Sequence, residues 1–263
     1  MNDQDILPRR LRVAAVVLFA LAMVGVVLLQ PRIPQPSAYH AFADQRRICG
    51  IPNFWNVMSN AAFTPVGLVG LWVMLRTPRP RFQETFERWA YLVIMGATVL
   101  GLGSAIYHLH PDNQTLFWDR LPMTLVFMAL LSATITERIH VKIGALLLLP
   151  FLLLGILSAE IWRMGELTGV GDLRFYLLVQ FYPMLAIPLM MALFPPRYTR
   201  TQDMGWLLLW YAAAKALEQW DGAVFRFTGG VMAGHALKHV AAALGLAVLV
   251  NMVAKRDVIA PRP

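Results

Sequence analysis

Residues 11–29 read LRVAAVVLFALAMVGVVLL, and this run decides the class of protein. A helix needs about 20 mostly apolar residues to cross about 30 Å of hydrocarbon, and residues 13–29 carry no charge. The whole chain agrees with this, because 58% of its 263 residues are hydrophobic and only 14% are charged. A soluble domain has about a quarter of its residues charged, so the sequence predicts a polytopic membrane protein.

The first run follows Arg9, Arg10 and Arg12, a positive flank that a secretory signal also carries. No small-residue cleavage site precedes residues 30–34, so we expect an uncleaved anchor helix. The further apolar runs are continuous rather than alternating, which excludes a transmembrane barrel. The sequence therefore predicts an all-α polytopic membrane helix bundle with eight spans, at residues 11–29, 54–75, 89–109, 117–137, 142–160, 173–194, 205–220 and 231–253.

The seventh predicted span is the most polar, because Lys215 and Glu218 interrupt it. Such charges fit a membrane helix only where they face the interior of a bundle. The chain is expected to divide into four parts. These are an N-terminal tip with its anchor helix at 1–30, an extracytoplasmic loop at 31–53, a seven-helix core at 54–253 and a cytoplasmic tail at 254–263.

The formal net charge of +8 would suggest nucleic acid as the partner of a soluble protein. Here the basic residues lie in short loops between apolar runs, which is typical of a membrane topology, so we expect no nucleic acid partner. Fourteen of the 23 lysines and arginines fall on the side of the N-terminus and six on the other side. This imbalance predicts that both termini are cytoplasmic. The single cysteine, Cys49, has no partner for an internal disulfide.

Polar residues gather at one membrane depth when the spans are threaded in this way. The third span runs outward and ends in Ser104 and His108, which are four apart and share one helical face. The last span starts on the same side with His235 and His239, also four apart, as a two-histidine metal clamp requires. Three imidazoles from distant parts of the chain are therefore expected to meet.

The fourth span adds a carboxylate at this depth. Asp119 and Pro122 fall in what we expect to be its first turn, where proline is tolerated. Three neutral imidazoles leave a zinc ion an open position for water and make that water easier to deprotonate. Asp119 could accept the proton or orient the water, and Ser104 could donate a hydrogen bond to the oxyanion that forms when water attacks a carbonyl.

Each of these residues also has an ordinary reading. Asp119 beside Arg120 could be an interfacial ion pair, and Ser104 in a glycine-rich stretch could simply allow close helix packing. The joint reading is favoured because separate spans deliver the polar groups to one depth, where unpaired polar groups are costly and usually functional. The remaining histidines that we considered, His40, His110 and His140, are expected to be interfacial or packed residues.

Four segments together resemble a known family. They are GLGSAIYH at 101–108, WDRLPM at 118–123, HALKH at 235–239 and the pair Ser59 and Asn60 on the second span. In their order and spacing, over about residues 53–246, they resemble the signature of the alkaline ceramidase family, which belongs to the CREST superfamily of membrane hydrolases. That superfamily also includes adiponectin-type receptors and GPI-anchor remodelling proteins, so the likeness is more specific for the superfamily than for one substrate.

The resemblance implies a seven-helix core preceded by one extra helix, a bound zinc ion and a membrane lipid substrate, the amide of a sphingolipid. At the positions that match the family's motifs, the resemblance implies that His108, His235 and His239 bind zinc. It implies that Ser104 and Asp119 assist the bound water. The residues expected to support them are Ser59, Asn60, Arg120 and Lys238.

Two departures from the family pattern bear on this interpretation. The family's acidic calcium-binding segment before the Ser-Asn helix is replaced by residues 46–56, with only Asp44 acidic nearby, which argues against a calcium ion. Together with the compact loops, this departure favours a bacterial inner membrane protein. Arg120 stands where the family has an acidic residue, and it could reposition the supporting groups or favour an anionic lipid headgroup.

Other charged residues are expected to form structural pairs rather than to act in catalysis. The expected pairs are Asp172 with Arg174, Lys215 with Glu218, and Lys238 with Glu218 or Asp221.

Three functions remain open from the sequence. The leading one is a zinc-dependent hydrolase that cleaves an amide, or an ester, of a membrane lipid. The second is a receptor-like or lipid-binding protein that keeps the metal only as a structural clamp. The third is a transporter, which no inverted repeat or pair of broken helices supports.

Overall fold

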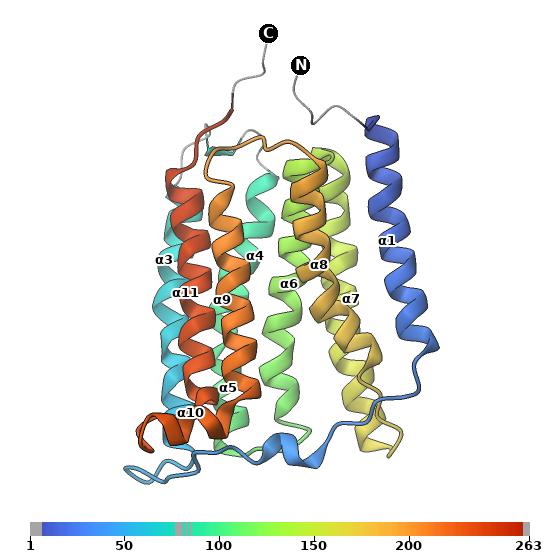
Figure 1. Cartoon of the computed structure of the whole chain (residues 1–263). Helices are drawn as coiled ribbons and strands as arrows, with labels where there is room; N and C mark the ends of the chain where they lie inside the picture. The colour runs from blue at the N-terminus through green and yellow to red at the C-terminus, as the bar shows by residue number, and fades with distance from the viewer. Residues whose placement is uncertain (1–6, 77–80, 83, 85, 260–263) are drawn as a thin grey trace.

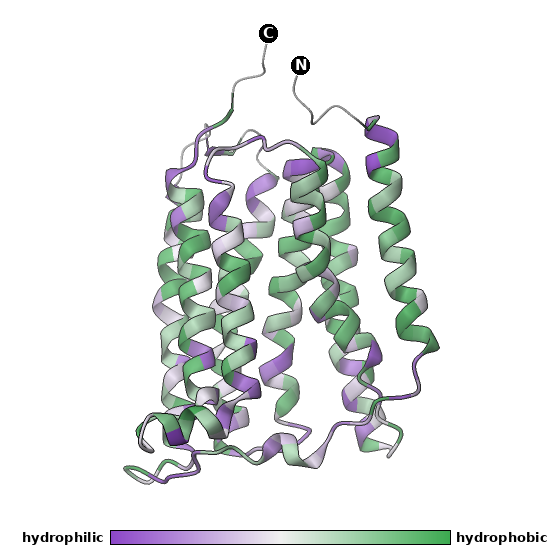
Figure 2. Cartoon of the chain, in the orientation of Figure 1, coloured by the Kyte–Doolittle hydropathy of each residue, from purple (hydrophilic) through white to green (hydrophobic). Residues whose placement is uncertain are grey.

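The bundle consists of long helices that run roughly parallel to one axis (Figure 1). The structure is a computed structural model that describes residues 7–76, 81–82, 84 and 86–259, and these residues form no β-strand. Hydrophobic residues dominate the middle parts of the helices, and hydrophilic ones gather toward the two ends of the bundle (Figure 2). The predicted all-α bundle of membrane helices is confirmed at this level.

Seven helical segments in the described ranges are long and apolar enough to cross a membrane. They are α1 (Arg9–Leu29), α2 to α3 (Phe54–Arg76), α4 to α5 (Glu87–Leu109), α6 (Leu116–Arg138), α7 (Val141–Leu167), α8 (Arg174–Leu193) and α11 (Gly234–Lys255).

Two of these segments change geometry along their length. A 3₁₀ turn, Ser59–Ala62, joins α2 (Phe54–Met58) to α3 (Phe63–Arg76). Gly101 separates α4 (Glu87–Leu100) from α5 (Leu102–Leu109). Both breaks lie next to predicted site residues, Ser59 and Asn60 at the first and Ser104 at the second. Each short helix can therefore take a direction different from that of the long helix it continues.

The predicted span at residues 205–220 is a helix of a different character. It forms α9 (Gln202–Gln219), which lies beside α11 within the bundle (Figure 1). This helix contains Asp203, Lys215 and Glu218, and it is not among the seven segments that are apolar enough to span by composition. The bundle therefore holds the eight predicted long segments, but only seven have the composition of a membrane span.

The sequence prediction for the end of α7 was wrong. We expected the helix to end at Glu160, whereas it continues to Leu167. Beyond the predicted end, Arg163 forms an ion pair of 2.6 Å with Glu160, three residues earlier, so the two charges neutralise each other on the helix surface.

The expected position of Pro122 in the first turn was also wrong. Because α6 begins at Leu116, this proline stands inside the helix, in its second turn. Proline removes the N–H that would pair with the carbonyl of Trp118. That carbonyl faces Gly103 of α5, where a side-chain Cβ would approach the oxygen to 2.8 Å. The glycine therefore lets α5 pack closely against the interrupted turn.

The two ends of the bundle differ in what covers them. Helix α1 begins and α11 ends at one end of the bundle, at the top of Figure 1, and residues 30–53 cross the opposite end. The short helix α10 (Asp221–Phe227) lies across that second end as well. The first helix, α1, packs against α8 at the edge of the bundle and buries only Val16.

Replacement of Gly144 by alanine is expected to destabilise the protein by about 1–3 kcal/mol, because the added methyl group would overlap the backbone of Thr136 where α7 meets α6. Thermal unfolding in neutral detergent measures this loss. Gly96→Ala in α4 is the matched control, since nothing lies within 4 Å of its Cβ position. Equal unfolding temperatures for the two variants would contradict the close approach of α6 and α7.

Candidate metal centre

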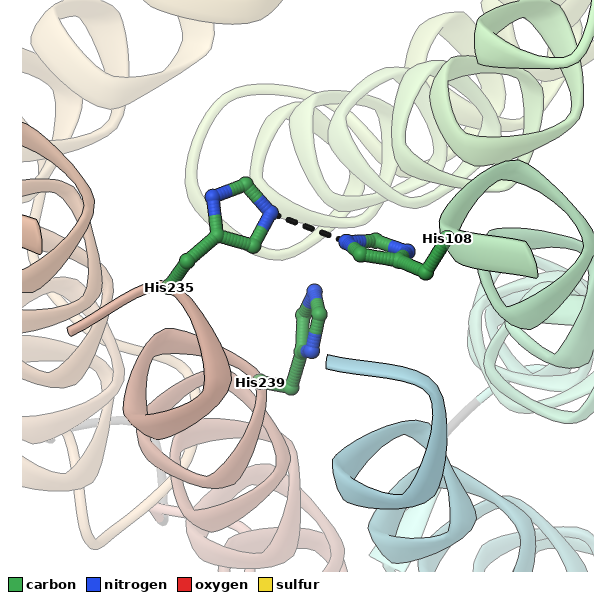
Figure 3. Close-up of side chains that lie close together, drawn as sticks. All are labelled: His108, His235 and His239. Atoms are coloured by element: carbon green, nitrogen blue, oxygen red, sulfur yellow. Dashed lines mark hydrogen bonds between the residues drawn. The ribbon is translucent and has the colours of Figure 1, made fainter. Parts of the chain in front are cut away.

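Three histidine side chains meet (Figure 3) at the end of the bundle where α5 ends and α11 begins (Figure 1). His108 comes from the last turn of α5, and His235 and His239 come from the first two turns of α11. Each offers one ring nitrogen, these nitrogens all lie within 4.8 Å of one another, and all three residues are buried. The Nε2 atoms of His108 and His235 are 2.9 Å apart. The structure therefore brings together the three histidines that the sequence predicted to meet.

The two helix ends that carry these histidines are held by side chains from other segments. The Asn53 amide donates a hydrogen bond of 2.8 Å to the carbonyl of His108, which α5 leaves unpaired at its end. The backbone N–H of His235 donates to the Asp221 carboxylate at 2.7 Å, in the first turn of α11. Gly234 lets this turn lie directly against the carbonyl of Leu217 in α9.

The hydrogen bonds of His108 define which of its ring nitrogens is free. Its Nδ1 lies 2.6 Å from the carbonyl oxygen of Ser104, which can only accept a hydrogen bond. Nδ1 therefore carries a proton, so Nε2 is the nitrogen whose lone pair serves as a metal ligand in the neutral ring. Since this Nε2 faces His235, the lone pair points into the space between the histidines.

A second histidine is set in the same way. The Ser59 hydroxyl donates to the carbonyl of Asn56 at 3.2 Å, so it accepts the hydrogen bond from Nδ1 of His239, 2.8 Å away. The Nε2 atom of His239 is buried and has no hydrogen-bond partner within the described residues. Outer hydrogen bonds of this kind fix metal-binding imidazoles in the orientation that their ligand atom requires.

The donor set fits a divalent transition metal ion. Two nitrogens that each lie about 2.0–2.1 Å from a tetrahedral zinc ion are about 3.3 Å apart. The observed separations run from 2.9 Å to at most 4.8 Å, on both sides of that value. Small side-chain rotations would bring His108, His235 and His239 into ligand positions, and the buried unpaired Nε2 of His239 would gain a partner.

Aromatic rings cover the centre from the side of the 30–53 segment. Phe42 stacks on His108 with ring centroids 5.1 Å apart and 18° between the planes, and its ring lies 4.6 Å from that of His235. Tyr107 packs edge-on to Phe42, and both residues are buried. The histidines are therefore shielded from the aqueous phase beyond this end of the bundle.

A buried hydroxyl and carboxylate pair lies beside the histidines. The Ser104 hydroxyl donates a short hydrogen bond to Oδ1 of Asp119 and lies 3.5 Å from Nδ1 of His108. Ser104 comes from α5 and Asp119 from the first turn of α6, and the exposed fractions are only 5% and 7%. The two predicted catalytic residues are thus in contact with each other at the edge of the histidine cluster.

The four predicted supporting residues have different surroundings. Ser59 alone among them hydrogen-bonds a histidine in the described structure. Asn60 donates to the carbonyl of Asn56 at 2.7 Å, Lys238 donates to Glu218 at 2.5 Å, and Arg120 donates to Gln35 at 2.5 Å. The alternative of an ion pair between Arg120 and Asp119 does not appear among the described residues, since the guanidinium turns to Gln35 instead.

A largely apolar cavity of about 280 Å³ adjoins this cluster. Ser104, Asp119 and His239 line it at the histidine end. Most of the rest is lined by aliphatic and aromatic side chains of α6, α8, α9 and α11, with a few polar side chains among them. Between α8 and α9 the cavity reaches Phe181, which is 37% exposed, and Lys215, whose side chain is 37% exposed. Reactive groups therefore lie at the inner end of a pocket that opens on the side of the bundle.

No family model, curated protein or solved structure matches this chain. The chemistry of the centre is therefore argued from its own residues.

The expected structural pairs of the loop before α8 and of α9 are confirmed. Asp172 pairs with Arg174 at 2.7 Å, and Glu218 pairs with both Lys215 and Lys238. The hydrogen bonds from Arg174 hold the pKa of the Asp172 carboxyl below its usual range.

Asp44, the only acidic residue near the segment that replaces the family's calcium-binding stretch, is also engaged. Arg46 donates to both of its carboxylate oxygens, at 2.8 and 2.7 Å, and lowers the pKa of this carboxyl. A carboxylate held in this way is occupied by a cation of the chain itself.

Several residues of the centre were not singled out from the sequence. Phe42 and Tyr107 carry no chemical signal, because aromatic residues are common in such a chain. Asn53 and Asn56 are polar residues at the start of an apolar span, a placement that could have pointed to them. His40, expected to be an ordinary packed residue, hydrogen-bonds Tyr107 and Asn113, at 3.0 and 2.9 Å.

Proposed function

We propose that this chain is a zinc-dependent membrane hydrolase that cleaves an amide, ceramide-like, or an ester bond of a membrane lipid. One observation carries the proposal. Three buried histidines converge beside the Ser104 and Asp119 pair, at the inner end of an apolar cavity. The resemblance of the motifs around these residues to the alkaline ceramidases supports the same reaction.

His108, His235 and His239 would hold the zinc ion. When bound by three neutral imidazoles, zinc supplies Lewis acidity and lowers the pKa of a coordinated water to about 7. The Nδ1 hydrogen bonds of His108 and His239 hold a ring proton on Nδ1 and leave Nε2 as the nitrogen that can bind the metal. The protein itself thereby fixes the tautomer that a metal ligand needs.

Asp119 acts as the proton acceptor in this proposal. Its carboxylate already accepts a hydrogen bond from Ser104, and it lines the cavity in which the substrate carbonyl would lie. A buried carboxylate at hydrogen-bond distance is suited to take a proton from water and to return it to the leaving amine or alcohol. Ser104 can turn its hydroxyl from Asp119 to the oxygen of the attacked carbonyl, where negative charge develops.

The apolar walls of the cavity suit an acyl chain. A substrate that enters between α8 and α9 would pass Phe181 and Lys215 and bring its polar part to Asp119 and the histidines. Such a path starts in the hydrocarbon of the bilayer, so the substrate would not have to leave the membrane.

We further propose that both termini are cytoplasmic and that the metal centre lies toward the outer side of a bacterial inner membrane. The lysine and arginine distribution favours this orientation, and α1 begins at the same end of the bundle at which α11 ends (Figure 1). In this orientation the three histidines would lie at the depth where the headgroups of the outer leaflet meet the hydrocarbon.

The direct test is turnover by the purified protein in mixed micelles. Ceramide and a diacyl ester lipid are supplied in parallel, and released fatty acid is measured by mass spectrometry together with the zinc content. We expect fatty acid release that stops after removal of zinc and returns when zinc is added. Absence of release from both lipids by zinc-loaded protein would overturn the hydrolase proposal.

Ser59→Ala is expected to lower zinc affinity by about 10–100-fold, because His239 loses the hydrogen-bond acceptor that fixes its ring. Competition with a zinc chelator measures this change. Ser158→Ala serves as the control, since its buried hydroxyl donates to the carbonyl of Gly155 in α7, away from the histidines. Equal zinc affinities in the two variants would show that Ser59 does not support the metal ligand.

A further inference from the structure

Arg120 is a buried cation at the inner end of the cavity. It follows Asp119 directly in α6, is only 4% exposed, and lines the same cavity as Ser104 and His239. A guanidinium this deep in a membrane bundle needs compensating partners.

The protein holds the Arg120 guanidinium firmly but does not pair its charge. Its Cζ lies 4.0 Å from the ring centroid of Trp162 and 4.5 Å from that of Tyr176, and Nη2 donates to Gln35 at 2.5 Å. Its Nη1 is buried without a hydrogen-bond partner, and no ion pair of the described residues includes Arg120.

The other charges that line the cavity do not supply a partner either. Lys215 and Lys238 share Glu218, and Asp119 accepts from Ser104. These cavity-lining groups, with Arg120, comprise three cations and two carboxylates, so one positive charge is left over. Of the three cations, Arg120 is the one that forms no ion pair within the described residues, and it also carries the unpaired donor Nη1.

We propose that Arg120 is the binding site for an anionic group of the lipid substrate, a phosphate or carboxylate carried in its headgroup. This inference rests on the proposed function and narrows its substrate to acidic lipids. The flat guanidinium suits oxyanions, to which it donates two parallel hydrogen bonds, and the two rings fix its plane. The acidic group would bind Nη1 while the amide or ester bond lies against Asp119 and the histidines.

Binding of non-hydrolysable probes tests the subsite separately from catalysis. Hexadecyl phosphate, hexadecanol and inorganic phosphate are titrated calorimetrically into the zinc-loaded protein in neutral maltoside micelles. We expect hexadecyl phosphate to bind at least about tenfold more tightly than hexadecanol, because only the phosphate pairs with the buried charge. Arg120→Gln should remove this difference, and Arg120→Lys should restore part of it.

Arg163→Gln is the matched control. Arg163 lies at the same end of the bundle and over the ring of Phe117, but it is paired with Glu160 and does not line this cavity. It should keep the wild-type preference for the phosphate. Equal affinity of wild type for the alcohol and the phosphate would overturn the proposal. Inorganic phosphate that binds as tightly as its alkyl ester would overturn the assignment to a lipid.

Turnover separates this inference from the proposed function. Ceramide and ceramide phosphate form a matched neutral and acidic pair, and Arg120→Gln should lower the ratio of kcat/KM for ceramide phosphate to kcat/KM for ceramide by about tenfold or more. If wild type cleaves neither lipid, the hydrolase proposal fails, and the probe titrations still decide whether Arg120 binds an anionic group.

Discussion

His239→Ala protein is expected to bind no zinc at stoichiometric levels and to release fatty acid about a thousandfold more slowly than wild type. His239 offers a buried Nε2 that has no other partner in the described structure, and its removal leaves only His108 and His235. Two imidazoles hold zinc weakly compared with three, and the ion is needed to activate the water.

Zinc content of the purified variant and its turnover of ceramide are measured on the same preparation. His110→Ala is the control, because His110 is an exposed histidine close to His108 in the chain. It should keep both zinc and activity. Wild-type turnover by His239→Ala protein that carries no zinc would remove the metal from the mechanism, and a wild-type zinc content would show that His239 is not a required ligand.

Asp119→Asn protein is expected to stay folded, to keep its zinc and to lose turnover by about 10²–10⁴-fold. The amide occupies nearly the same volume and can still accept the hydrogen bond from Ser104, but it cannot take a proton from water. The loss should appear in kcat, since the substitution leaves the apolar cavity walls unchanged.

This variant also separates the hydrolase from the receptor-like protein with a structural metal, the first two of the three functions that the sequence leaves open. A purely structural metal clamp predicts that loss of a histidine unfolds the bundle, and that Asp119→Asn has no effect on any property. Circular dichroism and thermal unfolding report the fold, and Asp257→Asn at the opposite end, where the side chain is exposed, controls for the change in charge. Unchanged turnover by Asp119→Asn would exclude this carboxylate as the proton acceptor.

Much of the bundle could be predicted from the sequence because apolar runs leave few alternatives. Helix limits failed where charges neutralise one another, as Glu160 and Arg163 do on α7. The polar helix α9 was predicted by position, but its three charged residues keep it out of the set of apolar spans. Which charged side chains pair with each other depends on tertiary contacts, and the spacing of residues along the chain does not show these.

The meeting of the histidines could be predicted because helical spacing and membrane depth together restrict where side chains lie. The spacing of four residues put His235 and His239 on one face, and chain direction put His108 at the same end. The hydrogen bond from His239 to Ser59 and the stacking of Phe42 on His108 depend on the 3₁₀ turn and on the path of a loop. Neither feature has a periodic pattern in the sequence, so both required the structure.

Phe42 seals the histidines from the water beyond the bundle, while the pocket reaches the flank of the protein between α8 and α9. A hydrolase that takes its substrate through this opening would meet only lipids that diffuse laterally within the bilayer. Its rate would follow the mole fraction of substrate within the bilayer, so that dilution by inert lipid slows the reaction and dilution by buffer does not.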